Sequence, residues 1–297
     1  MLEQEYYNED KYDYEYRKEL NMSDELAIKR DEETGLVVMD IPSEFEGIGS
    51  EQLGADDRTV PWFKILQGGS PEIKSANSRV EGAQPGMFYN SATGDLFSGD
   101  EGVEITICTT ERKFVEYAPK DKGGGFIGKH EPGSPVVREA EAHSKLNDIW
   151  PIERPNKNRI VDTRYLYVLV GDCLEPAVMA ISSSKLKNFK NSYKEKMSIY
   201  HRCRVKNSNG DKVKPPLCMI RFIVKSFDDV GKGEDFSNLK MFFAVDDNIN
   251  KSIRSFDDPI VKLGIQVAED FNNSNIQVDY AEERVDSDEV IDVKVFE

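Results

Sequence analysis

Short apolar runs separated by turn residues dominate the chain from residue 61 onward. Gly, Pro, Asn and Asp interrupt these runs, and the turn-type sequences at 90–94 and 207–210 are typical of hairpin loops. Many short strands with frequent turns indicate a β-sandwich or a β-barrel. The predicted strands are residues 61–66, 87–90, 103–109, 113–117, 164–170, 177–181, 219–227 and 239–245.

Two segments replace this pattern with helical spacing. Residues 182–200 begin with serines suited to capping, and their apolar positions recur every three or four residues. That stripe consists of Leu186, Phe189, Tyr193, Met197 and Tyr200. At residue 258, Asp258 and Pro259 form a start signal before Ile260, Leu263, Val267 and Phe271. We therefore predict two amphipathic helices.

The predicted fold class is mainly β with a few helices, an OB-like barrel or sandwich core with acidic, flexible termini. We expect an acidic, mostly disordered arm at 1–55, a β-rich core with a C-terminal helix at 56–272, and an acidic tail at 273–297. Within the arm, 23–30 can form a short helix and 36–41 an extended piece. Residues 119–155 form one excursion of the core, with a strand hint at 135–138 and a short helix near Ala140.

Charge is distributed unevenly along the 297 residues, whose net charge is -16. The first 58 residues carry -12 and the last 33 carry -8, so residues 59–264 carry +4. A chain this acidic is not a uniformly basic nucleic-acid coat. We find no membrane helix, no signal peptide and no paired cysteines, which predicts a cytoplasmic protein.

The positive charge is concentrated in residues 184–225, which hold twelve cations and two acids. A solvated helix face with a basic hairpin explains this excess, but cations interleaved with aromatic rings also form single-strand grooves. The candidate nucleic-acid-binding residues are Lys185, Lys187, Lys190, Lys194, Arg202, Arg204, Lys206, Lys212, Lys214 and Arg221. The candidate stacking rings are Tyr117, Phe126, Tyr200 and Phe222, whereas Phe189 and Tyr193 belong to the core.

Other motifs do not carry chemistry. Residues 123–130 (GGGFIGKH) match the spacing of a phosphate loop, but His130 replaces the magnesium ligand and Pro132 follows where a helix must begin. Adjacent acid pairs such as Asp246 and Asp247 fit turns better than a metal site. The three histidines, His130, His143 and His201, are ordinary surface or half-buried residues. We predict no catalytic residue, no metal and no cofactor.

Residues 61–67 (PWFKILQ), 70–72 (SPE), 82–90 (GAQPGMFYN) and 93–94 (TG) resemble a family of tailed-bacteriophage proteins. Residues 115–117, 123–126 and 182–187 continue the likeness, which covers about 58–245. The resemblance implies single-stranded DNA binding. The acidic end is similar to the tails of phage single-strand binding proteins, which implies partner docking through Phe296, although that ring is penultimate here rather than final.

The sequence thus predicts a protein that binds single-stranded nucleic acid, most simply DNA, during phage replication or recombination. Its acidic ends would modulate binding, and the C-terminal tail would recruit phage or host replication proteins, without any membrane partner. The alternative is a structural or interaction protein, either a virion component or an inhibitor of a host enzyme that imitates DNA. A metal-dependent nuclease is the second alternative.

Overall fold

The computed structural model describes residues 60–119, 121, 125–147, 152–228 and 237–273, apart from the side chains of 183–188. Every described residue belongs to one compact unit of the chain, Leu53–Glu297. The predicted arm elements at 23–30 and 36–41 lie outside the described residues, as does the tail from 274. None of the described helices is long and apolar enough to span a membrane.

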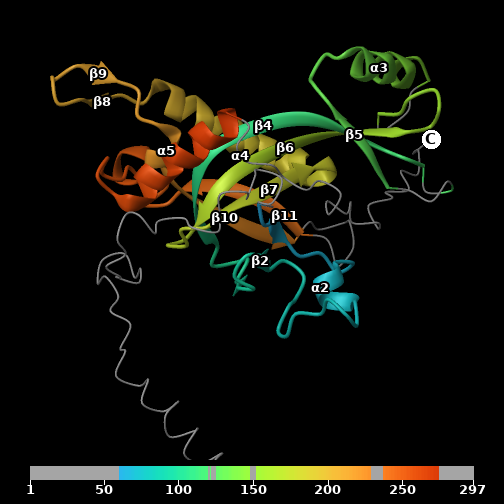
Figure 1. Ribbon diagram of the computed structural model, residues 1–297, viewed down its shortest axis with the longest axis horizontal. Helices are drawn as coiled ribbons and strands as arrows, with labels where there is room; N and C mark the ends of the chain where they lie inside the picture. The colour runs from blue at the N-terminus through green and yellow to red at the C-terminus, as the bar shows by residue number, and fades with distance from the viewer. Residues whose placement is uncertain (1–59, 120, 122–124, 148–151, 229–236, 274–297) are drawn as a thin grey trace, which may run out of the picture. The chain divides into compact units, whose positions relative to one another are not determined.

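The described part is mainly β, as predicted, and its largest element is an antiparallel sheet in the order β11-β10-β4-β6-β7, with β5 on β4 (Figure 1). Its strands are β4 (Val103–Tyr117), β5 (Phe126–His130), β6 (Arg159–Val170), β7 (Pro176–Ser182), β10 (Arg221–Asp228) and β11 (Ser237–Phe243). Within the described residues the edge strands β7 and β11 do not pair with each other, so the strands form no closed barrel.

Strand β4 is one 15-residue element where the sequence predicted two strands, at 103–109 and 113–117. The pattern is broken between them because Thr110, Glu111 and Arg112 are partly or largely exposed. Pairing with β6 nevertheless runs from Ile105 to Tyr117, with one bulge between Ile107 and Thr109. Backbone pairing, which the side-chain pattern does not report, makes the strand continuous.

Both predicted helices are confirmed. The main core is the large apolar cluster that contains Ile105, Leu166 and Phe222. Helix α4 (Ser183–Arg202) follows β7 directly and buries Phe189, Tyr193 and Tyr200 in this core. Helix α5 (Pro259–Asn272) begins as the sequence predicted, since the Asp258 side chain accepts a hydrogen bond of 2.9 Å from the Ile260 amide. It packs on the opposite face of the sheet from the main core, over β4 and β6.

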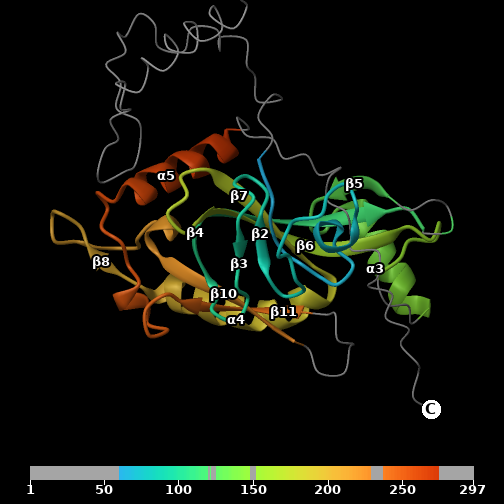
Figure 2. The ribbon, with the colours of Figure 1, turned by 90° about the horizontal axis from the view of Figure 1, so that it is seen from below.

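A second, small sheet of β1 (Phe63–Ile65), β2 (Phe88–Asn90) and β3 (Leu96–Phe97) lies over the large one (Figure 2). Phe63 and Phe88 stack with ring centres 5.4 Å apart and enter the main core, and the short helix α2 (Pro71–Lys74) follows β1. The buried Gln67 amide fastens this sheet to β11, because it donates to the Ser237 carbonyl (3.0 Å) and accepts from the Ser237 amide (2.9 Å).

The excursion at 119–155 holds β5 and helix α3 (Pro135–Asn147). The helix near Ala140 is confirmed, and the strand hint at 135–138 is wrong, because Val137 and Ala140 share the buried face of α3. Further along, β8 (Val205–Lys206) and β9 (Lys212–Val213) form the predicted hairpin around 207–210. The short helices η5 (Leu217–Met219) and η6 (Ile249–Lys251) flank β10 and β11 in the sequence.

We predict that Gln67→Leu lowers the free energy of unfolding by about 2 kcal/mol, because the buried Ser237 amide and carbonyl both lose their partner. Urea denaturation measures the change. Gln84→Leu, at an exposed position, serves as the control and should change stability by less than about 0.5 kcal/mol. Equal stability of the two variants would show that the Gln67 bonds do not hold the small sheet.

Candidate nucleic-acid interface

A hollow of about 590 Å³ lies where the end of α4, the β8–β9 hairpin and η6 meet. Four of its nine lining residues are cations, and three are aliphatic. The lining residues are Ile199, Arg202, Cys203, Arg204, Val205, Lys206, Lys212, Ile249 and Asn250. None of the described residues that line this basic hollow is an acid, and the hollow brings together four of the ten cations predicted from the sequence.

The cations of the basic hollow have no ion pairs among the described residues. The Arg202 guanidinium donates to the Ser198 carbonyl at 3.2 Å, and Arg204 donates to the carbonyls of His201 and Cys203 at 2.8 and 2.7 Å. Carbonyl oxygens position a guanidinium without neutralising it, so its charge remains available to a phosphate.

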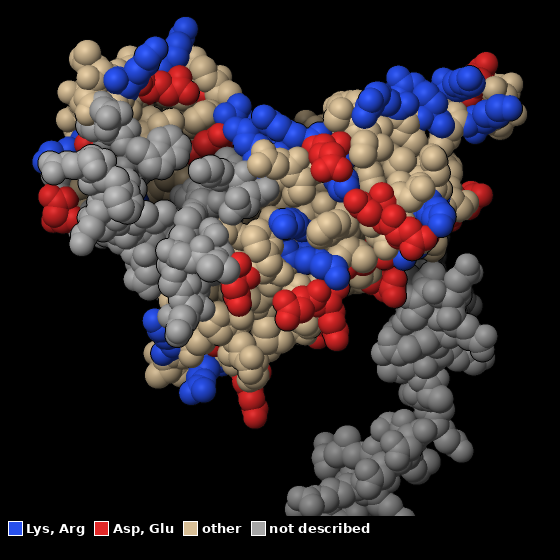
Figure 3. Space-filling model, turned by 180° about the vertical axis from the view of Figure 1, so that it is seen from behind, with Lys and Arg blue, Asp and Glu red and all other residues tan. Residues whose placement is uncertain are grey.

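The hairpin itself concentrates charge. Lys206 and Lys212 face each other across β8 and β9, an arrangement in which like charges repel. Lys214 follows β9, and its Nζ lies 4.4 Å from the centre of the Tyr200 ring. Figure 3 shows Lys and Arg gathered over this end of the molecule. An anion bound here would relieve this repulsion.

The remaining predicted cations are placed differently. Lys190 is partly exposed and Lys194 exposed on α4, and the side chains of Lys185 and Lys187 are outside the described set. Arg221 is a correction: it forms an ion pair with Glu104 at 2.5 Å, and the hydrogen bonds that it donates to that carboxylate raise the pKa of the guanidinium. Its charge is already neutralised, so we no longer assign it to the interface.

Three of the four predicted stacking rings are also corrected. Phe222 is completely buried beside Phe243, Tyr117 is 4% exposed, and Tyr200 is 7% exposed. The Tyr200 hydroxyl donates to the Pro215 carbonyl at 2.9 Å. Rings enclosed in this way offer no face to a base. Phe126 is 37% exposed, but it lies on β5, at the opposite end of the described structure from β8 (Figures 1 and 2).

Sequence reasoning missed the contribution of η6 to the basic hollow. Ile249 and Asn250 lie more than 40 residues from β8, and neither their type nor their spacing indicates a binding site. Cys203 also lines the hollow, and burial raises the pKa of its thiol, which disfavours the reactive thiolate form. Among the described residues, no three His, Cys, Asp or Glu side chains meet as metal ligands would.

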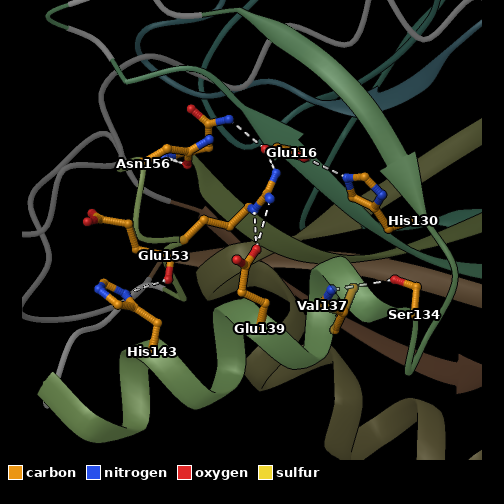
Figure 4. Close-up of polar contacts among 10 residues, drawn as sticks. Glu116, His130, Ser134, Val137, Glu139, His143, Glu153 and Asn156 are labelled. Carbon is orange, nitrogen blue, oxygen red and sulfur yellow. Dashed lines mark hydrogen bonds and ion pairs between the residues drawn. The ribbon is translucent and has the colours of Figure 1, made fainter.

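A second polar cluster surrounds Glu116, whose side chain is only 3% exposed (Figure 4). Its oxygens accept hydrogen bonds from Asn158 (2.5 Å) and Arg154 (2.9 Å), and one lies 2.7 Å from His130 Nε2. Arg154 also pairs with Glu139 of α3 at 2.8 Å. The cluster thus connects β4, β5, α3 and the segment before β6.

The electrostatics of Glu116 mark it as structural. Burial by itself raises the pKa of this carboxyl, but the hydrogen bonds from Asn158, Arg154 and His130 outweigh burial and leave the pKa below its ordinary value. A carboxylate held ionised by three neighbours is a poor general base. His130 and His143 both act as local hydrogen-bonding groups, the latter at 3.0 Å from the Glu153 carbonyl.

Comparison with known proteins gives one family. The bacteriophage family described as Pam3 phage gp34-like protein matches residues 32–253, about three quarters of the chain. Neither the curated proteins nor the solved structures gave a match.

We predict that Glu116→Gln lowers stability by about 2 kcal/mol at pH 7 and progressively less at acid pH. The lowered pKa means that Glu116 stabilises the fold above the pKa it has when unfolded, and that this contribution is lost as pH falls through the folded value. Urea midpoints of the wild type and the variant at pH 7, 5 and 3 measure the difference. A difference in urea midpoint between the two proteins that stays constant from pH 7 to pH 3 would contradict the structural role assigned to the ionised Glu116.

Proposed function

The chain belongs to the Pam3 phage gp34-like protein family, and from that premise we propose that it binds single-stranded nucleic acid, DNA in the first place, during phage replication or recombination. The observation that carries the proposal is the basic hollow, where Arg202, Arg204, Lys206 and Lys212 converge without an acid in the lining. Phosphates carry most of the affinity of such complexes, and cations of this kind bind them.

The apolar part of the hollow favours an unpaired strand over a duplex. Ile199, Val205 and Ile249 lie beside the cations. A duplex presents phosphates, sugars and groove edges to a protein, whereas a single strand also exposes the flat faces of its bases. Aliphatic side chains next to phosphate-binding cations can contact those faces, which gives the apolar lining a use that a duplex would not supply.

The acidic ends enter the proposal as regulators. A tethered polyanion competes with nucleic acid for a cationic surface at high effective concentration, so weak ligands are excluded first. The tail also contains Val290, Ile291, Val293, Val295 and Phe296 among its acids, a composition suited to docking on a phage or host replication protein. Co-purification with phage particles or a host enzyme, without oligonucleotide binding, would favour the virion or inhibitor alternative.

We predict that Arg204→Glu combined with Lys212→Glu weakens binding of a labelled 30-mer oligonucleotide more than tenfold. Each phosphate contact that the substitutions remove should also reduce the slope of log affinity against log salt by about 0.7. Fluorescence polarisation at two salt concentrations measures both quantities.

The matched control is Arg138→Glu with Lys145→Glu, which makes the same charge change at exposed positions on α3. This control should bind nearly as the wild type does, because screening removes most interactions beyond about 10 Å at 0.1 M salt. If both double variants lose affinity equally, net charge alone governs binding and the basic hollow is not the site.

We predict that removing residues 274–297 tightens oligonucleotide binding several-fold at 20 mM salt and little at 200 mM salt. The truncation retains α5 and its C-cap residue Asn273, so the described fold keeps its elements. Phe296→Ala should leave oligonucleotide affinity unchanged and lose partner docking alone. Unchanged affinity of the truncated protein at low salt would show that the tail does not compete with the oligonucleotide.

A further inference from the structure

The outer face of strands β10 and β11 carries a set of side chains that the core does not use. Because successive residues of a strand point to opposite faces, three cross-strand pairs share this face. They are Ile223 with Phe242, Lys225 with Lys240, and Phe227 with Asn238. The alternate residues, including Phe222, Val224, Leu239 and Met241, point inward and form the main core.

Five of these six residues are partly or fully exposed, whereas Asn238 is completely buried. Ile223, Phe227 and Phe242 are partly exposed and belong to none of the apolar clusters of the described part. Further along the same face, α5 covers β4 and β6. Apolar packing by the described elements therefore leaves out the β10–β11 end of this face.

The two lysines on this face indicate that a ligand bound there carries negative charge. Lys225 and Lys240 lie directly opposite each other, which is unfavourable for like charges, and neither forms an ion pair within the described residues. Lys240 Nζ lies 4.5 Å from the centre of the Phe227 ring. By contrast, Lys196 on α4 and Arg221 on β10 both have carboxylate partners. An anion placed between Lys225 and Lys240 would turn their repulsion into attraction.

We propose that this face, here called the β10–β11 platform (Ile223, Lys225, Phe227, Lys240 and Phe242), holds bases of the single strand. The inference rests on the proposed function and adds to it the surface that reads the bases. A partly exposed ring beside a lysine fits a nucleotide, since the base stacks on the ring and the phosphate meets the cation. Phe227 and Phe242 are offset by four residues along the strands, roughly 13 Å, so each ring takes its own base.

A fluorescence experiment tests the stacking directly. Phe242→Trp and Phe227→Trp place an indole on the platform, and titration with a 30-mer of deoxythymidine should quench each variant well beyond the wild-type change. Leu146→Trp, at a position 84% exposed on α3, is the control and should not be quenched further than the wild type. The three variants differ only in where the reporter lies.

Replacing the same rings with alanine measures how much each contributes to oligonucleotide affinity. Phe227→Ala and Phe242→Ala should each weaken oligonucleotide binding roughly 5- to 100-fold, as expected for the loss of one stacked base. Phe227→Tyr and Phe242→Tyr keep a ring and should retain most of the affinity. Urea midpoints of each pair show whether the alanine variants remain folded, and the tyrosine and tryptophan variants carry the test if they do not.

The outcomes separate this inference from the proposed function. If the wild type binds and the basic-hollow variants weaken binding, but the ring variants bind normally without quenching, the platform assignment is overturned and the function stands. If the wild type binds no oligonucleotide at low salt, the function itself fails. If removal of residues 274–297, rather than oligonucleotide, changes the fluorescence of the Phe242→Trp variant, the acidic tail occupies the platform and the base-binding assignment is overturned.

Discussion

Backbone hydrogen bonding along β4 is the interaction on which the rest of the structure depends. Its first residues, Val103 to Thr106, pair with β10, its last residues pair with β5, and β6 pairs with it from Ile105 to Tyr117. The bulge after Ile107 leaves Cys108 in the cluster under α5 while Ile105 and Ile107 stay in the main core. Through this strand the β10–β11 platform and the Glu116 cluster belong to one sheet.

The sequence predicted the elements whose signals are local. Both long helices were found because caps and apolar stripes are properties of contiguous residues, as the Asp258 cap shows. Strand β5 was missed because Gly128 within it and the three glycines before it are typical of a loop, and only pairing with β4 makes it extended. The sequence predicted two strands in place of β4, because polar residues interrupt its apolar pattern. Backbone hydrogen bonds with β6 nevertheless continue through this polar stretch.

The candidate site shows the same limit. The excess of cations in 184–225 was visible in the sequence, and four of them do converge. Which cations are neutralised was not visible, because the partners of Arg221 and Lys196 are Glu104 and Asp247, far away in the chain. The stacking rings failed for a related reason, since an aromatic residue beside lysines in sequence can still point into the core, as Tyr200 and Phe222 do.

Pairing of charges therefore distinguishes the two kinds of cation in this protein. Lys196, with a side chain only 4% exposed, pairs with Asp247 at 2.6 Å, and its neighbour Ser192 accepts the Met241 amide at 3.2 Å. These contacts hold α4 on the free edge of β11, so the edge is covered and the helix is fixed in place.

The same helix ends at Arg202, and the strand that it covers carries Lys240 and Phe242. The neutralised Lys196 thus positions α4 on β11, and these two elements carry Arg202 into the basic hollow and Lys240 onto the β10–β11 platform, both without an ion pair among the described residues. A ligand that binds either surface meets a backbone that is already held in place, so it loses less free energy in ordering these elements.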